Sequence, residues 1–163
     1  MIRTGTPADI ESVREIAHIS WNDTYEGIIP SPIQLKFLEQ SYSTPMLEMR
    51  MERTILLLAE QDGQAVGFAN FTKVDEDGDA ELIAMYMKPE HQRSGFGKKL
   101  LSDGLSRLKG GQQLFVYVES ENQKGRNFYE ANGFLLLEEF EELFEGHPLQ
   151  TAKYVFDLSG QAQ

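Results

Sequence analysis

Apolar residues along the chain recur with two different periods, and the order of these patterns predicts a mixed α/β fold. Residues 10–21 carry apolar side chains at a spacing of 3.6, directly after Thr6-Pro7-Ala8-Asp9, a sequence typical of a helix start. No repeat or Pro/Gly/Ser linker divides the chain, so residues 1–163 are expected to form a single domain. Further helices are predicted over 32–40, 44–52, 95–109 and 122–132, and strands over 1–4, 54–59, 65–74, 80–87, 114–118, 134–140 and 152–158.

The connections between these segments predict how the sheet is wound. Asp62-Gly63 suits a tight hairpin turn because both positions tolerate positive φ angles. With the acidic turn 75–79, it predicts three antiparallel strands, the last of which (80–87) is apolar almost throughout and is expected to be buried on both faces. A strand, helix and strand then follow as a right-handed crossover with parallel strands, and the final antiparallel pair is joined through Gly146-His147-Pro148. The prediction is a mostly antiparallel sheet with one parallel pair and helices on both faces.

Composition and charge narrow the chemistry. There is no cysteine, which excludes disulfides, thiolate catalysis and cysteine-based metal sites. His18, His91 and His147 lie far apart and match no metal-ligand spacing, so no metal is expected. The net charge of −11 disfavours nucleic acid and anionic lipid and favours cationic partners, while an anionic cofactor would need a local basic patch. The chain has neither a long apolar run nor a signal-peptide core, so no membrane association and a cytoplasmic location are expected.

That basic patch is present in the turn between the strand 80–87 and the helix 95–109. The turn reads Gln92-Arg93-Ser94-Gly95-Phe96-Gly97-Lys98-Lys99. Gly95 and Gly97 allow a ligand to approach the backbone, and the free amides of a first helical turn can donate to phosphate oxygens. An alternative is a solvated loop with two incidental glycines. The spacing matches neither a P-loop nor the dinucleotide-binding pattern.

These residues resemble the pyrophosphate loop of the GNAT family of N-acetyltransferases, Gln/Arg-x-x-Gly-x-Gly/Ala, at Gln92, Gly95 and Gly97. A second block, 122–134, is similar to the family's Asn-x-x-Ala-x-x-(apolar)-Tyr-x-x-x-Gly-Phe, with Gly125 in place of the alanine. The order of elements also fits from residue 1 to 158. The resemblance therefore implies the GNAT fold, with the parallel strand pair at a cofactor cleft.

The resemblance also implies roles for individual residues. Tyr129 matches the tyrosine that protonates the departing thiolate of coenzyme A, and its alternative role is core packing. Asn122 would contact the pantetheine arm, or serve as a plain helix N-cap, or both. Phe128 is grouped with the cofactor residues, although it is also well placed to pack in the core. The other implied cofactor-binding residues are Met85, Tyr86 and Met87 for the pantetheine arm, Gln92 to brace the loop, and the backbone of Arg93, Ser94, Gly95, Phe96, Gly97 and Lys98 for the pyrophosphate.

The base and the acceptor site are less sharply marked. Glu81 lies eleven residues before Gln92, the spacing at which histone-acetylating members of the family carry a glutamate base; the alternative is an edge carboxylate. The family's acceptor loop corresponds here to 21–30, which looks similar to that of small polyamine-acetylating members. It supplies Trp21, Tyr25, Glu26 and Ile28 as acceptor-binding candidates, with a core role as the alternative for Trp21. The acidic run 138–142 is typical of a solvated face, but near the cleft it could receive an ammonium.

The sequence thus predicts an acetyl-CoA-dependent N-acetyltransferase without a metal. Transfer is expected to be direct, because the chain has no cysteine to carry an acyl group. The expected partner is a small-molecule amine, in particular a cationic amine or polyamine, and a homodimer is a possible assembly. The alternatives are acetylation of a protein N-terminus or lysine, and a non-catalytic acyl-CoA-binding sensor.

Overall fold

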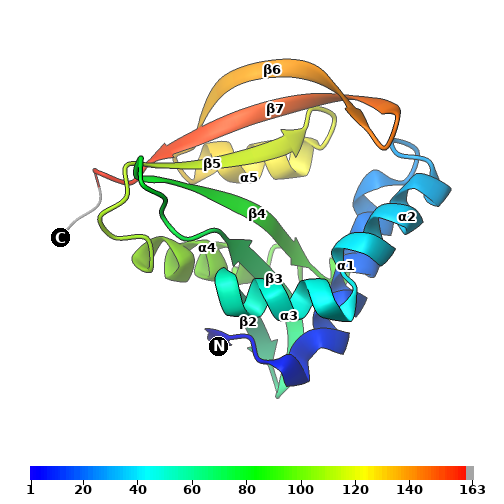
Figure 1. Cartoon of the computed structure of the whole chain (residues 1–163), viewed down its shortest axis with the longest axis horizontal. Helices are drawn as coiled ribbons and strands as arrows, with labels where there is room; N and C mark the ends of the chain where they lie inside the picture. Colours follow the sequence, from blue (N-terminus) through cyan, green and yellow to red (C-terminus); the bar gives the residue numbers. More distant parts are fainter. Residues whose placement is uncertain (161–163) are drawn as a thin grey trace.

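The computed structural model describes residues 1–160, which form one seven-stranded sheet in the order β1-β2-β3-β4-β5-β7-β6 (Figure 1). Neighbouring strands are antiparallel except β4 and β5, which are parallel. This confirms the predicted mixed sheet with one parallel pair. The strands are β1 (Ile2–Thr4), β2 (Ile55–Gln61), β3 (Gln64–Phe71), β4 (Asp79–Met87), β5 (Gln113–Glu119), β6 (Leu135–Phe144) and β7 (His147–Asp157).

Helices cover both faces of the sheet and create two separate cores. On one face Ile16 of α1 and Leu47 of α3 pack with Phe68, and on the other Leu100 of α4 packs with Phe71 and Tyr154. Among the described residues, no helix combines the length and apolarity needed to span a membrane. The helices are α1 (Ile10–Tyr25), α2 (Ser31–Ser41), α3 (Thr44–Arg53), α4 (Phe96–Ser106) and α5 (Gln123–Ala131), with short 3-10 helices η1 (Pro7–Asp9) and η2 (Pro89–His91).

One of two predicted hairpin turns lies where the sequence placed it, and the other ends earlier than predicted. Asp62 and Gly63 have φ angles of 53° and 78°, as the predicted tight turn requires. In the last hairpin the same pair of positive angles falls on Glu145 (50°) and Gly146 (79°). The turn therefore ends at Gly146, and the next two residues, expected in the turn, begin β7.

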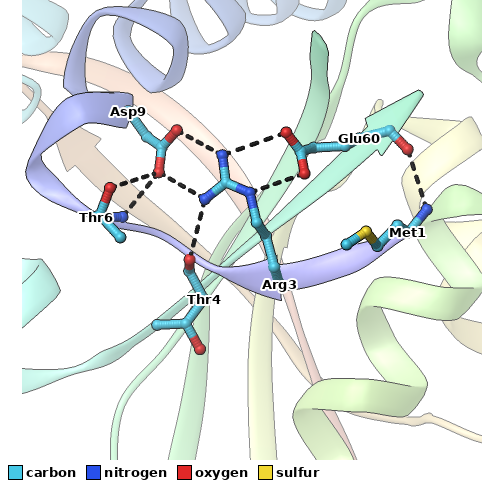
Figure 2. Close-up of polar contacts among 6 residues, drawn as sticks. All are labelled: Met1, Arg3, Thr4, Thr6, Asp9 and Glu60. Atoms are coloured by element: carbon cyan, nitrogen blue, oxygen red, sulfur yellow. Dashed lines mark hydrogen bonds and ion pairs between the residues drawn. The ribbon is translucent and has the colours of Figure 1, made fainter. Parts of the chain in front are cut away.

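An ion-pair network ties the N-terminal strand to the rest of the domain (Figure 2). Arg3 on β1 donates from both Nη atoms to the carboxylate of Asp9, at 2.8 and 2.7 Å, and from Nε to Glu60 Oε1 on β2 at 2.8 Å. The Asp9 carboxylate also accepts from the amide of Thr6 at 2.8 Å. One guanidinium thus joins β1, β2 and the start of the first helical segment.

A β-bulge in β4 corrects one prediction. Asn70 of β3 pairs with Ala84 and Phe71 pairs with Leu82, so Ile83 is an extra residue on β4. As a result Leu82 packs in the core beside α4, whereas Ala84 packs in the core beside α1. The expectation that 80–87 is buried on both faces is wrong, since Ile83 is 39% exposed.

The bulge coincides with the point where β4 and β5 part. The parallel ladder joins only 79–82 of β4 to 113–116 of β5. Beyond Leu82 and Val116 the two strands diverge, as their ribbons show (Figure 1), while β4 stays paired to β3 as far as Met87. The half of β4 after the bulge therefore has a neighbouring strand on one side only.

Candidate active site

The separation of β4 and β5 opens a cleft of about 980 Å³, called here the main cleft. Its walls come from the second half of β4, the facing part of β5, the end of α1, the loop before α4, and α5. The structure brings most of the predicted site residues together in this one space. Those that line it are Tyr25, Met85, Tyr86, Met87, Gln92, Arg93, Gly95, Gly97, Lys98, Asn122, Phe128 and Tyr129.

The loop before α4 is built to expose backbone amides. Gly95 is the N-cap of α4 with a φ of 87°, which favours glycine, and Arg93 also has a positive φ of 64°. The first bond of the helix runs from the amide of Lys99 to the carbonyl of Gly95 at 3.1 Å. The amides of Phe96, Gly97 and Lys98 therefore have no partner within the helix and mark its positive end.

Gly97 faces the ring of Phe128 on α5. A Cβ at this position would lie 3.4 Å from Cε1 of Phe128, which is van der Waals contact, so the space beside Gly97 is bounded by this ring. Phe128 is partly buried against the α4 core and lines the cleft at the same time. The ring therefore packs as one of the two expectations required, and contact with a cofactor stays a prediction.

The basic character of this end of the cleft is stronger than the loop alone suggested. Arg93 and Lys98 line the cleft, and so do His91 and Lys124, which were not predicted as site residues. Lys124 lies in the block 122–134, close to the start of α5. Its positive charge was the only feature of the sequence that could have marked it as a site residue. Asp23 and Glu121 are the acidic residues of the lining, so the cleft contains carboxylates as well as basic side chains.

Tyr129 projects from α5 into a mostly apolar environment. It is 7% exposed, and its ring lies 5.3 Å from that of Phe128 and 5.2 Å from that of Phe134. Within residues 1–160 its hydroxyl makes no hydrogen bond, although it borders the main cleft. Burial raises the pKa of Tyr129 above its usual value, so the phenol stays protonated at neutral pH.

Asn122 holds the start of α5. Its Oδ1 accepts from the amide of Gly125 at 3.0 Å, which is the N-cap role anticipated from the sequence. A Cβ at Gly125 would come within 2.7 Å of Nδ2 of Asn122, which gives a steric reason for the glycine where the resemblance has an alanine. The side chain also lines the cleft, so contact with a cofactor remains a prediction that is compatible with the cap.

Several predicted residues lie outside the main cleft. The side chain of Phe96 is buried in the α4 core, and Ser94 Oγ donates to the carbonyl of His91. Glu81 is half-buried on β4 before the bulge, and its amide donates to Thr72 Oγ1 at 2.9 Å. Burial raises the pKa of Glu81, an effect opposed by Lys153. A base role for Glu81 would therefore need a connecting water.

The acceptor candidates are split between core and surface. Trp21 is 5% exposed, stacks on Phe37 at 4.5 Å and donates from Nε1 to the hydroxyl of Tyr86 at 2.9 Å. Its environment is that of a core anchor that orients Tyr86 on the cleft wall. Glu26 is exposed outside both cavities described here, whereas Ile28 lines a second one.

This second space, called here the acidic cavity, has a volume of about 420 Å³ and lies at the end of β5. Three glutamates line it, and only Glu139 belongs to the acidic run noted in the sequence; Glu138, Glu141 and Glu142 lie outside both cavities. The full lining is Ile28, Glu119, Ser120, Glu121, Glu139, His147, Pro148, Leu149 and Gln150. Glu121 lines the main cleft as well, so the two spaces share this one residue.

Comparison with known proteins agrees with this architecture. Residues 13–134 match the model of the acetyltransferase (GNAT) family, and the chain belongs to that family. It is therefore an acetyltransferase, as the resemblance implied.

Two curated relatives and one solved structure are similar over most of the chain. The spermidine N(1)-acetyltransferase of Thermoplasma acidophilum is 32% identical over 141 residues, which cover 82% of this chain and 86% of the relative. The uncharacterized N-acetyltransferase YuaI of Bacillus subtilis is 31% identical over 127 residues, 71% of this chain and 70% of the relative. The crystal structure of the PaiA N-acetyltransferase from Thermoplasma acidophilum in complex with coenzyme A superposes with a TM-score of 0.81 at 27% identity, covering 96% of this chain and 98% of that one.

Proposed function

We propose that the protein transfers an acetyl group from acetyl-CoA to the primary amine of a small cationic acceptor. The observation that carries this proposal is the composition of the main cleft. Unpaired helix amides with basic side chains, an unpaired stretch of strand and a buried phenol all border one continuous space. These are the features that an anionic, extended thioester donor requires.

The donor fits the cleft in sections. The pyrophosphate is proposed to bind the amides of 96–98, assisted by Arg93 and Lys98, because a helix N-terminus favours negative charge. The pantetheine arm is proposed to run along 85–87, where β4 has no strand neighbour on the β5 side. The coenzyme A bound in the solved PaiA relative supports this donor class.

The chemistry needs a neutral amine and a proton donor. The amine nitrogen attacks the thioester carbonyl carbon, the carbon–sulfur bond breaks, and the electron pair leaves with sulfur. Tyr129 is proposed to give its proton to that sulfur, and Glu81, through water, is proposed to take the proton lost by the amine. Because burial raises the pKa of Tyr129, its proton is expected to move as the bond breaks rather than before.

The acceptor class follows from charge and from similarity. The chain carries a net charge of −11, and the carboxylates of Asp23 and Glu121 are part of the cleft lining. Such a field attracts cations at long range. The 32% identical relative named a spermidine N(1)-acetyltransferase supports the same class.

The test is the release of coenzyme A with different acceptors. Spermidine, a monoamine with a neutral tail and an acidic peptide are compared at low and high salt. We expect spermidine to give the highest kcat/KM, and this value should fall several-fold between about 50 and 500 mM salt as the attraction is screened. A preference for the acidic peptide, or rates that do not change with salt, would favour a protein acetyltransferase. Binding of acetyl-CoA with no turnover on any amine would instead indicate a sensor.

A further inference from the structure

Two consecutive residues near the end of α1 hold two consecutive residues in the half of β4 that follows the bulge. Ser20 Oγ donates to the carbonyl oxygen of Met87 at 3.0 Å, and Trp21 Nε1 donates to the hydroxyl of Tyr86 at 2.9 Å. Ser20 and Trp21 are only 2% and 5% exposed. The stretch along which the pantetheine arm is proposed to run is therefore fixed from the α1 side, through its main chain and through one side chain.

The bond from Trp21 determines how the Tyr86 hydroxyl can act. An indole nitrogen carries a hydrogen and can only donate, so the oxygen of Tyr86 must be the acceptor. The hydrogen of that hydroxyl is consequently directed away from Trp21. Because Tyr86 lines the main cleft, this hydrogen is available either to a group bound in the cleft or to another residue of the wall.

Tyr25 is the residue of the wall that could take this hydrogen. Burial raises the pKa of Tyr25 to about 12, and hydrogen bonding by Tyr86 opposes the rise. Tyr25 lines the main cleft as well. Two hydroxyls cannot donate to each other at the same time, and the indole of Trp21 accepts no hydrogen bond. At least one of the two phenolic hydrogens is therefore left for a ligand with an acceptor atom.

The acyl donor supplies such an atom. A cationic amine brings N–H donors, whereas the thioester brings a carbonyl oxygen, which becomes negatively charged when the amine attacks. Burial raises the pKa of Tyr86 well above its usual value, and neighbouring phenols, among them Tyr25 and Tyr129, add to the rise. Tyr86 therefore keeps its hydrogen at neutral pH. It can stabilise the charged oxygen without transferring a proton.

We propose that the Tyr86 hydroxyl donates a hydrogen bond to the thioester carbonyl oxygen and stabilises the negative charge that develops there during acetyl transfer. The N–H of Trp21 supports this role, because it occupies the Tyr86 oxygen and leaves the O–H for the cleft. Tyr86 belongs to the segment 85–87 along which the donor is proposed to bind, which favours it over Tyr25 as the final donor. This inference rests on the proposed function, because it requires acetyl-CoA as donor and an amine as acceptor.

The experiment compares acetyl-CoA with its dithioester analogue, in which sulfur replaces the carbonyl oxygen, and uses spermidine as the acceptor. Sulfur is a weak hydrogen-bond acceptor, so the loss of a donor should matter little to the analogue. The variants are Tyr86→Phe and Tyr25→Phe, with Tyr42→Phe as the matched control. The rings of Tyr42 and Tyr86 lie 6.1 and 5.8 Å from that of Phe68 in the same core, but Tyr42 lines neither cavity.

Tyr86→Phe should lower kcat by about 10²-fold with acetyl-CoA, the lower end of the effect of removing one such donor, and by less than about threefold with the dithioester. The KM for acetyl-CoA should change little, because the bond strengthens only as charge develops. The ratio of the two losses does not depend on the fraction of folded enzyme, since both donors are measured on one preparation. Tyr42→Phe should change kcat by less than about twofold with either donor.

A second measurement does not require turnover. In infrared difference spectra of bound acetyl-CoA, isotope-labelled at the carbonyl carbon, the carbonyl stretch should lie at a lower frequency in the wild type than in Tyr86→Phe. Equal losses with both donors in Tyr86→Phe, an unchanged carbonyl band, or an oxygen-specific loss confined to Tyr25→Phe would overturn the role of Tyr86 and leave the proposed function standing. If the wild type transfers an acetyl group to no amine, the proposed function itself fails.

Discussion

Removing a single oxygen from Tyr129 separates a catalytic role from a packing role. The ring is held by Phe128 and Phe134, and the hydroxyl has no hydrogen-bond partner in the described part of the chain. Tyr129→Phe therefore opens no cavity and leaves no protein group unsatisfied. We expect the free energy of unfolding to change by no more than about 0.5 kcal/mol.

Turnover should respond very differently. If the phenol protonates the leaving thiolate, its loss should lower kcat by roughly 10²-fold, which corresponds to about 2.7 kcal/mol in the barrier. Binding of coenzyme A should persist, since none of the proposed phosphate contacts involves the hydroxyl. The measurements are kcat and KM from coenzyme A release, and the melting temperature with and without coenzyme A.

Tyr154→Phe provides the matched control. The Tyr154 side chain is fully buried, and its hydroxyl donates to Glu130 and accepts from Arg126 Nε at 3.0 Å. Removing this oxygen takes one hydrogen bond from each of two charged groups, Glu130 and Arg126, although Arg126 keeps its pairing with Glu139. We therefore expect a loss of about 1–3 kcal/mol in stability, or roughly 2–12 °C in melting temperature. The two variants should thus show opposite profiles. If Tyr129→Phe keeps full turnover, or loses as much stability as Tyr154→Phe, Tyr129 is a packing residue and another group supplies the proton.

Three further predictions concern the loop, the base and acid stability. Gly97→Glu should abolish the rise in melting temperature caused by acetyl-CoA, because it places a negative side chain beside Phe128 where the phosphates are proposed to bind. Gly97→Ala should keep most of the rise. A full rise in the glutamate variant would show that the loop is not part of the donor site. Glu81→Gln should lower kcat by roughly 10²-fold with little change in the KM for acetyl-CoA, and an unchanged kcat would exclude Glu81 as the base. Arg3 lowers the pKa of Asp9 from 3.8 to about 2, so the ion pair should contribute about 2 kcal/mol above pH 5 and lose this contribution as the pH falls to 2. In urea titrations Asp9→Asn should therefore lose stability at pH 7 and show a flatter acid dependence, and an acid dependence equal to that of the wild type would contradict this explanation.

The elements and their order could be predicted because each has a local cause. Asp62-Gly63 specifies its turn through backbone conformation alone. The start of α4, whose N-cap is Gly95, is indicated by two glycines and a cluster of basic side chains. The region of the cleft then followed from the resemblance, which depends on contiguous residues. The residues that carry such signals lie within a few positions of one another, so they can be recognised without knowledge of the tertiary structure.

The bulge and the acidic cavity could not be predicted for the same reason. The extra residue at Ile83 is apolar like its neighbours, and only the pairing with β3 reveals that it is out of register. Glu119 and Glu139 are twenty positions apart in the sequence, on β5 and β6. They line the same cavity because both strands pair with β7. Trp21 posed the opposite difficulty, since an aromatic side chain at the end of an amphipathic helix is compatible with both a core and a pocket.

The main cleft depends on the number of residues in β4 more than on which side chain occupies the extra position, Ile83. Substituting Ile83 with another β-forming residue leaves the residue count between Leu82 and Ala84 unchanged, so the phase change between the two cores survives. Deleting it would shift the strand by one position, turning Tyr86 away from Trp21 and exchanging the faces of every side chain as far as Met87. A substitution at Ile83 is therefore expected to leave the cleft in place, whereas a one-residue deletion at this position would disrupt the cleft as a whole.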